Sequence, residues 1–227
     1  MKWLFRILLI AGIFFIGSSL FYTIICKWIP VPVTPLMVIR CAQQLSERKP
    51  LKLKHDWVRR DKISRNLKLA VICSEDQNFI SHGGFDLEAI DKAIKESRTR
   101  NKRVRGASTI SQQTAKNVFL WPGRSWIRKG LEVWFTALIE LLWSKERILH
   151  VYLNSIEMGD GIYGAEAAAR AYFGISAERL SARQSAAIAA VLPNPRKYKA
   201  ASPGPYVAGR IEWILGQMRQ YGPLDLK

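Results

Sequence analysis

The sequence has few of the side chains that build disulfide frameworks and metal centres. Its 227 residues include three cysteines and three histidines. Cys41 and Cys73 would be able to pair in an oxidising compartment, but the simpler interpretation is two small buried side chains. No spacing is typical of a zinc site. The sequence therefore indicates neither a disulfide scaffold nor a zinc domain.

Acidic residues are also scarce. Asp and Glu number 18 against 35 Lys and Arg, which gives a formal net charge of +17. Such an excess favours an anionic partner: a nucleic acid, an anionic membrane surface or a phosphorylated substrate. Composition does not choose among the three. The length suits one well-buried domain with a small appendage.

Charge is missing altogether from residues 7–26, ILLIAGIFFIGSSLFYTIIC. About 20 apolar residues are enough for a helix that spans the hydrocarbon core of a bilayer. A cleavable signal peptide would have a shorter apolar region followed by small residues, whereas CKWIPVP ends this one. Lys2 and Arg6 favour a cytoplasmic N-terminus. We therefore predict a cytoplasmic stub and a retained transmembrane anchor over residues 1–27.

Residues 28–60 are predicted to form a basic, membrane-proximal connector. WIPVPVTP at 28–35 has three prolines in eight residues, which predicts that no helix starts there. The basic stretch SERKPLKLKHDWVRR follows, with apolar residues interspersed. Two interpretations are open: a solvated linker, and a segment that rests on anionic headgroups.

Residues 61–227 are predicted to form one mainly α domain. Ser64, Asp86 and Ser181 each precede a stretch with helical apolar periodicity and are expected to begin helices. Few segments alternate with the period of two that is typical of a half-buried strand. Glycine-rich loops separate the helices.

The stretch CSEDQNFISHGG at 73–84 places two carboxylates, Glu75 and Asp76, side by side near the predicted end of a helix. Functional residues concentrate where elements enter such loops. Partial burial beside an aromatic would raise the pKa of a carboxyl group toward the range of a general base. Ordinary surface acids, or an ion pair with an arginine, are the alternatives that spacing alone leaves open.

A second polar stretch is RGASTISQQTAKN at 105–117. Ser108 or Thr109 can cap a helix, whose free amide groups would suit an anion. A sugar or phosphate would fit the donors on this helix, although a solvated polar face is the alternative. The polar side chains that recur there at helical spacing are Gln112, Gln113, Lys116 and Asn117.

A cationic group follows at Arg124, Arg128 and Lys129, with Glu132 four residues after Arg128. The plain interpretation is a helix ion pair worth a few tenths of a kcal/mol. The functional interpretation is a cationic clamp beside a second acid, since one guanidinium group can bind two oxygens of a phosphate at once. Further on, Asn154 is a polar exception in a largely apolar segment and a candidate to line a cleft.

Read together, these stretches resemble the peptidoglycan glycosyltransferase family, the lipid II polymerases with a lysozyme-like fold. The match spans about residues 64–198, and it most resembles the monofunctional members, because no K-T-G of a transpeptidase domain occurs. One departure is Glu157, where many relatives have tyrosine. Five motifs appear in the family's order: E-D-x-x-F-x-x-H-x-G from Glu75, G-A/G-S-T-I-x-Q-Q-x-x-K-N from Gly106, R-K-x-x-E from Arg128, S-K-x-x-I-L-x-x-Y-L-N from Ser144, and G-x-x-x-A-A-x-x-Y-F-G from Gly164.

The resemblance implies a reaction and roles. A glycan chain on undecaprenyl pyrophosphate would be the donor and lipid II the acceptor, joined by a β-1,4 bond with inversion. Glu75 would be the general base, Asp76 would orient or support it, and Glu132 would hold the cations or assist the leaving phosphate. The residues expected to bind substrate are Ser108, Gln112, Gln113, Lys116, Asn117, Arg124, Arg128, Lys129 and Asn154.

The resemblance also implies surroundings for the reaction. No cofactor is certain, and a divalent metal ion, Mg²⁺ or Mn²⁺, at the pyrophosphate is left open. The expected partners are lipid II, the growing glycan and the membrane, with other wall-building proteins left open and no nucleic acid. The expected location is the bacterial inner membrane, with a single span and a periplasmic catalytic domain.

Two other functions compete. A muramidase, or a glycan-cleaving enzyme like a lytic transglycosylase, also uses a pair of acids, but it needs no clamp for pyrophosphate. A membrane-tethered basic binding protein would tolerate loss of Glu75, because a negative charge does not help it to bind nucleic acid or act as a scaffold.

Overall fold

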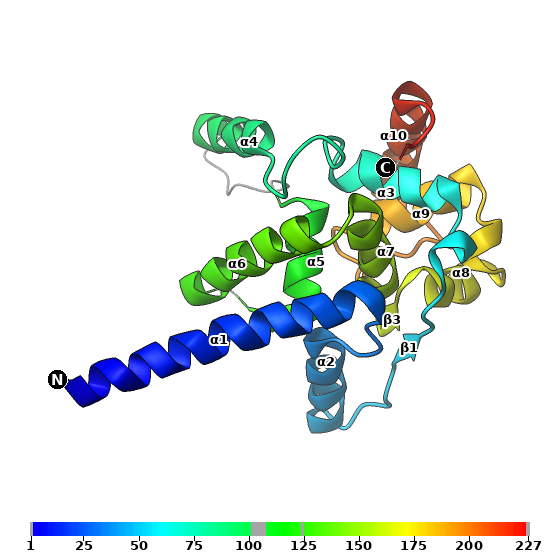
Figure 1. Cartoon of the computed structure of the whole chain (residues 1–227). Coiled ribbons are helices and arrows are strands. Elements are labelled where there is room, and N and C mark those ends of the chain that lie inside the picture. Colours follow the sequence, from blue (N-terminus) through cyan, green and yellow to red (C-terminus); the bar gives the residue numbers. More distant parts are fainter. Residues whose placement is uncertain (1, 101–107, 124, 226–227) are drawn as a thin grey trace.

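The structure is a computed structural model that describes residues 2–100, 108–123 and 125–225. Helices dominate it, and the N-terminal helix projects away from the rest of the molecule (Figure 1). The mainly α class predicted from the sequence is confirmed. The described helices are α1 (Lys2–Trp28), α2 (Pro35–Ser46), α3 (Arg65–Glu75), α4 (Leu87–Arg100), α5 (Ile110–Phe119), α6 (Trp126–Leu142), α7 (Lys145–Ser155), α8 (Ala165–Phe173), α9 (Ala182–Val191) and α10 (Pro205–Tyr221), with short 3₁₀ helices η1 (Arg60–Lys62) and η2 (Ala177–Arg179).

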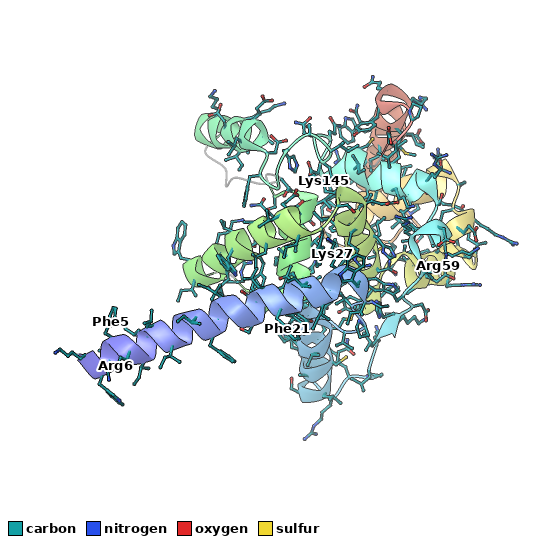
Figure 2. All side chains as sticks on the ribbon, in the orientation of Figure 1. Phe5, Arg6, Phe21, Lys27, Arg59 and Lys145 are labelled. Atoms are coloured by element: carbon teal, nitrogen blue, oxygen red, sulfur yellow. The ribbon has the colours of Figure 1, made fainter. Side chains whose placement is uncertain are left out.

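The helix α1 is long and apolar enough to cross a membrane. Phe5 and Arg6, near its free end, stand clear of the rest of the molecule (Figure 2). Its last third instead packs on α6: Trp134 Nε1 donates to Ser19 Oγ at 3.1 Å, and Trp143 Nε1 donates to the carbonyl oxygen of Thr23 at 2.9 Å. The helix α1 is therefore free at one end and docked on the domain at the other.

The connector contains a helix that the prolines did not predict. The structure starts α2 at Pro35, the last residue of the stretch from which we excluded a helix start. Proline fits there because the first helical position needs no intrahelical N–H bond. Thr34 caps this helix, its Oγ1 accepting from the amide of Met37 at 3.3 Å, and Met37 is buried. Part of the connector is thus folded onto the domain.

A small sheet joins the connector to the helical domain. Its strands are β1 (Lys54–His55), β2 (Glu157–Gly159) and β3 (Ile162–Tyr163), in the order β1-β3-β2. The pair β1/β3 is parallel and the pair β2/β3 antiparallel. Strands of two or three residues are too short to show alternation, which explains why the sequence did not predict them.

The helix starts expected from polar residues are confirmed. Ser64 Oγ accepts from the amide of Asn66 at 3.2 Å, and Asp86 Oδ1 accepts from the amide of Ala89 at 2.8 Å. Ser181 opens α9 with a capping box that Gln184 completes. Each cap satisfies an amide that would otherwise lack an intrahelical partner. Behind these caps, α3, α9 and α10 pack together and place the end of α3 at the candidate site.

The turn before α8 requires glycine, and Gly164→Ala is expected to destabilise the protein by about 2 kcal/mol or more. Gly164 has a φ of +81°, and an added Cβ would lie 2.6 Å from the carbonyl oxygen of Asn154. The matched control is Gly216→Ala on α10, where a Cβ would meet nothing within 4 Å. That variant should gain about 0.5–1 kcal/mol. Urea unfolding of both variants checks this; equal stability would contradict the strain at Gly164.

Candidate active site

The acid pair lies at the end of α3, on the wall of a cleft. This cleft has a volume of about 350 Å³ and lies between the end of α3, the start of α4 and the residues before α5. Glu75 and Asp76 line it together with Ser108. The predicted base and one predicted substrate-binding residue therefore share one cavity.

Glu75 is held by neighbours from two other helices. Gln113 Nε2 donates to Glu75 Oε2 at 3.0 Å, and Tyr152 Oη donates to Gln113 Oε1 at 3.2 Å, which fixes the orientation of the amide. Burial raises the pKa of Glu75, while the Gln113 hydrogen bond and the charge of Arg210 oppose that rise. The result is an oriented carboxylate that is a better proton acceptor than an exposed glutamate.

Asp76 is built into the backbone around it. Its carboxylate accepts from His82 Nε2 at 2.9 Å and from the amide of Ile110 at 2.9 Å. The amide of Gly84 donates to His82 Nδ1 at 3.1 Å, so the ring proton is on Nε2. Asp76 thereby ties the loop after α3 to the start of α5, and with it Glu75 to Gln113. His82 therefore shapes this loop.

A second network supports the same loop from α6 and α7. Lys145 Nζ donates to the carbonyl oxygen of His82 at 2.6 Å and to Glu140 Oε1 at 2.7 Å, and lies 4.8 Å from the ring centroid of Phe79. Gly84 has a φ of +91°, and an added Cβ would lie 2.8 Å from Glu140 Cγ. This role for Lys145 was not predicted from the sequence, although Lys145 is the lysine of the motif that begins at Ser144.

The polar residues of α5 divide between the cap and the site. Gln112 is 4% exposed and completes the capping box of α5, its Oε1 accepting from the amide of Thr109 at 3.1 Å. This structural role accounts for a glutamine that we expected to bind substrate. Gln113 contacts the base, Ser108 is exposed in the cleft, and Asn117 is buried.

The cationic group of α6 is built on one buried carboxylate. Glu132 is 3% exposed; Arg128 Nη1 donates to its Oε2 at 2.7 Å, and Lys129 Nζ donates to its Oε1 at 2.5 Å. Glu132 is buried and pairs with two cations, whereas the plain interpretation was a single i, i+4 helix ion pair. The predicted clamp residue Arg124 lies outside the described residues.

Lys116 connects the cationic group to the acid pair. It stands three residues after Gln113 on α5 and interacts electrostatically with Glu132, Arg128, Lys129 and Glu75. Burial lowers the pKa of Lys116, and the charge of Glu132 opposes that change. A substrate that spans both groups would therefore meet a proton acceptor at one end and positive charge at the other.

Asn154 of α7 and Glu157 after it do not line the cleft of the acid pair. Asn154 is fully buried: its Oδ1 accepts from the amide of Val58 at 2.9 Å, and its Nδ2 donates to the carbonyl oxygens of Val58 and His150. The oxygen and the nitrogen of its side-chain amide both bond to the backbone, so the predicted contact with substrate finds no support. Glu157 lies in β2 and lines a separate cavity beside Arg40.

The carboxylates of the site do not form a metal centre by themselves. Within the described residues, no group of three or more His, Cys, Asp and Glu side chains could hold a metal ion. Both oxygens of Glu132 accept from cations, and Asp76 accepts from His82 and Ile110. The residues present therefore do not fit a protein-held Mg²⁺ or Mn²⁺, and no chemical step is assigned to one.

Comparison with known proteins agrees with this geometry. Residues 42–219 match the profile of the family described as Transglycosylase. The chain is 54% identical over 212 residues to a biosynthetic peptidoglycan transglycosylase of Pseudomonas putida, covering 93% of this chain and 89% of that protein. The namesake protein of Pseudomonas aeruginosa is 52% identical over 222 residues, covering 98% of this chain and 95% of that protein. That of Bacteroides thetaiotaomicron is 56% identical over 218 residues, covering 95% and 88%.

The match includes all of the site described above, from the end of α3 to α10. It confirms the family expected from the order of the five motifs, and with it an enzyme that transfers glycosyl groups. The chain belongs to the transglycosylase family.

Proposed function

We propose that this peptidoglycan glycosyltransferase polymerises lipid II into β-1,4-linked glycan strands with release of undecaprenyl pyrophosphate. The observation that carries the proposal is the pairing of Glu75, an oriented and partly buried carboxylate, with a cationic group built on Glu132. Lys116 interacts with both. This arrangement suits a reaction in which a proton is taken at one point and a concentrated negative charge leaves at another.

Glu75 acts at the attacking end of the reaction. It takes the proton from the 4-hydroxyl group of the acceptor sugar as that oxygen forms a bond to the anomeric carbon of the donor. Attack from the face opposite the leaving group inverts that carbon. Gln113 keeps the carboxylate oriented, and Asp76 keeps the end of α3 in register with α5. Asp76 is thus a positioning residue in this scheme.

The cationic group acts at the leaving end. The bond between the anomeric carbon and the phosphate oxygen breaks, and its electron pair leaves with the pyrophosphate. Lys116, Arg128 and Lys129 stabilise this charge where it develops, with Arg124 as a further candidate. Glu132 holds Arg128 and Lys129 in place. Ser108 and Asn117 are candidates to bind sugar and phosphate oxygens.

The membrane supplies both substrates, and α1 fits a single span of the inner membrane with its N-terminus in the cytoplasm. The first turn of α6 supports this placement: Trp126 is 92% exposed and Ile127 77% exposed, directly before Arg128 and Lys129. Apolar side chains next to cations suit the boundary between acyl chains and headgroups. The catalytic domain then lies in the periplasm, at the level of the lipid pyrophosphate.

Incubation of the purified full chain with lipid II in detergent tests the proposal. We expect glycan polymer on a gel, with undecaprenyl pyrophosphate released as each bond forms. A parallel incubation with preformed glycan strands should leave them uncut. Absence of polymer from folded protein would refute the polymerase, and cleavage of the strands would favour the muramidase alternative.

A further inference from the structure

Arg210 of α10 reaches the last turn of the helix that carries Glu75. Its Nη2 donates to the carbonyl oxygen of Ser74 at 3.0 Å and to Ser74 Oγ at 3.4 Å. Ser74 Oγ in turn donates to Glu75 Oε1 at 3.4 Å. The guanidinium carbon lies 3.9 Å from the ring centroid of Trp213, so the group is stacked as well as hydrogen-bonded. A held positive charge therefore stands beside the candidate base.

The end of α3 is a place where a negative charge is unfavourable. The C-terminus of a helix carries a partial negative charge and leaves carbonyl oxygens without intrahelical partners. Glu75 is the last residue of α3 and is partly buried, so both effects oppose its ionised form. An arginine bonded to a terminal carbonyl group offsets these effects. It donates a hydrogen bond to the unpartnered oxygen, and its positive charge compensates the negative charge at the helix end.

Other elements also present groups to Glu75. Gln113 and Lys116 come from α5, Tyr152 from α7, and Asp76 adds a like charge. Burial raises the pKa of Tyr152, so its hydroxyl stays neutral. Lys116 is shared with the cluster around Glu132, which leaves Arg210, among the residues that the structure describes, as the cation bonded directly to the turn that carries the base.

We infer that Arg210 is a positioning residue for Glu75, fixing the last turn of α3 and keeping a positive charge beside the carboxylate. The inference rests on the proposed role of Glu75 as general base. Arg210 lies 136 residues from Ser74 and after the last of the five motifs. Without its charge, Glu75 takes up a proton at a higher pH, and less of the enzyme is active near neutrality.

The test is the pH profile of kcat/KM for lipid II polymerisation by the full chain. Arg210→Gln removes the charge, Arg210→Lys keeps it with fewer donors, and Gln217→Ala is the matched control. Gln217 Oε1 accepts from Gln77 Nε2 at 2.9 Å, which is a neutral link between α10 and the residues that directly follow α3. Thermal unfolding of each variant shows that it is folded.

We expect the acid limb of the Arg210→Gln profile to move up by about half a unit to one unit. Activity below the limb should then fall by about 3-fold to 10-fold and recover on the alkaline plateau. Arg210→Lys should move the limb by less, and Gln217→Ala should leave it in place. If Arg210→Gln does not fold, the smaller shift in Arg210→Lys carries the test.

Two results would overturn the inference. One is a loss of activity in the Arg210 variants that is the same at every pH, which is what a purely structural contact would give. The other is an equal shift in Gln217→Ala. Failure of the wild type to make polymer would instead refute the proposed function, so the two failures are distinguishable.

Discussion

Glu75→Gln is expected to abolish detectable polymer, lowering kcat by about 10²-fold to 10⁴-fold, the usual contribution of a general base. Glutamine keeps the shape of the side chain and can still accept from Gln113 Nε2, which bonds Glu75 Oε2 at 3.0 Å. What it loses is the ability to take a proton. The measurement is single-turnover polymerisation of lipid II.

The stability of this variant should not fall. Burial raises the pKa of Glu75, so the ionised carboxylate is less stable in the folded chain than in the unfolded one. That cost is present above the unfolded pKa and disappears when the group is neutral, so glutamine should leave the melting temperature equal or higher at neutral pH. Glu178→Gln, at an exposed ion pair with Lys62, is the control and should retain activity. Full turnover by Glu75→Gln would show that the base is another residue.

Glu132→Gln is expected to be the second most damaging change, with kcat/KM lowered by roughly 100-fold. Glutamine in this position cannot neutralise Arg128 and Lys129, which both donate to Glu132. The two cations then repel each other and Lys116, and lose the geometry that we propose receives the leaving pyrophosphate. Steady-state kinetics with lipid II measure the loss.

This change also affects folding, so a control must separate the two effects. Glu132 is 3% exposed, and we expect a stability loss of about 1–3 kcal/mol. Glu166→Gln matches it: Glu166 is 9% exposed, and Arg170 Nε, four residues later, donates to it at 2.8 Å. The control should lose stability yet keep its activity per folded molecule. Near-normal turnover of folded Glu132→Gln would reduce Glu132 to a helix ion pair.

The sequence predicted local structure well where one residue decides it. Ser64 and Ser181 begin helices because a side-chain oxygen next to an apolar-periodic stretch satisfies free amides. Pro35 was misjudged for the same local reason, because proline breaks a helix from within but fits its first position. The three strands are too short to give a periodic signal, and β1 pairs with a strand that is distant in the sequence, Lys54 opposite Ile162.

The site was predicted as a set of residues but not as a set of contacts. The motifs pointed to Glu75 and Gln113, yet only the fold brings them within hydrogen-bond distance. Asn154 is buried against backbone, and in a sequence a polar residue on an apolar helix has the same appearance whether it faces a cleft or a neighbouring backbone. Arg210 lies outside the motifs, and nothing in the sequence on either side of it predicts its contact with the end of α3.

The docking of α1 on α6 has a consequence for how the enzyme stands at the bilayer. Arg147 Nη2 donates to the carbonyl oxygen of Cys26 at 2.7 Å, and Trp143 bonds that of Thr23. These hydrogen bonds hold the last turns of α1 on the domain, while the free end of α1 is apolar and exposed. A helix held in this way is fixed to the domain at one end and is not joined to it by a flexible tether. In the membrane placement proposed for α1, this docking would set the height and tilt of the cleft relative to the lipid, and with them the distance from the membrane surface at which each bond is made.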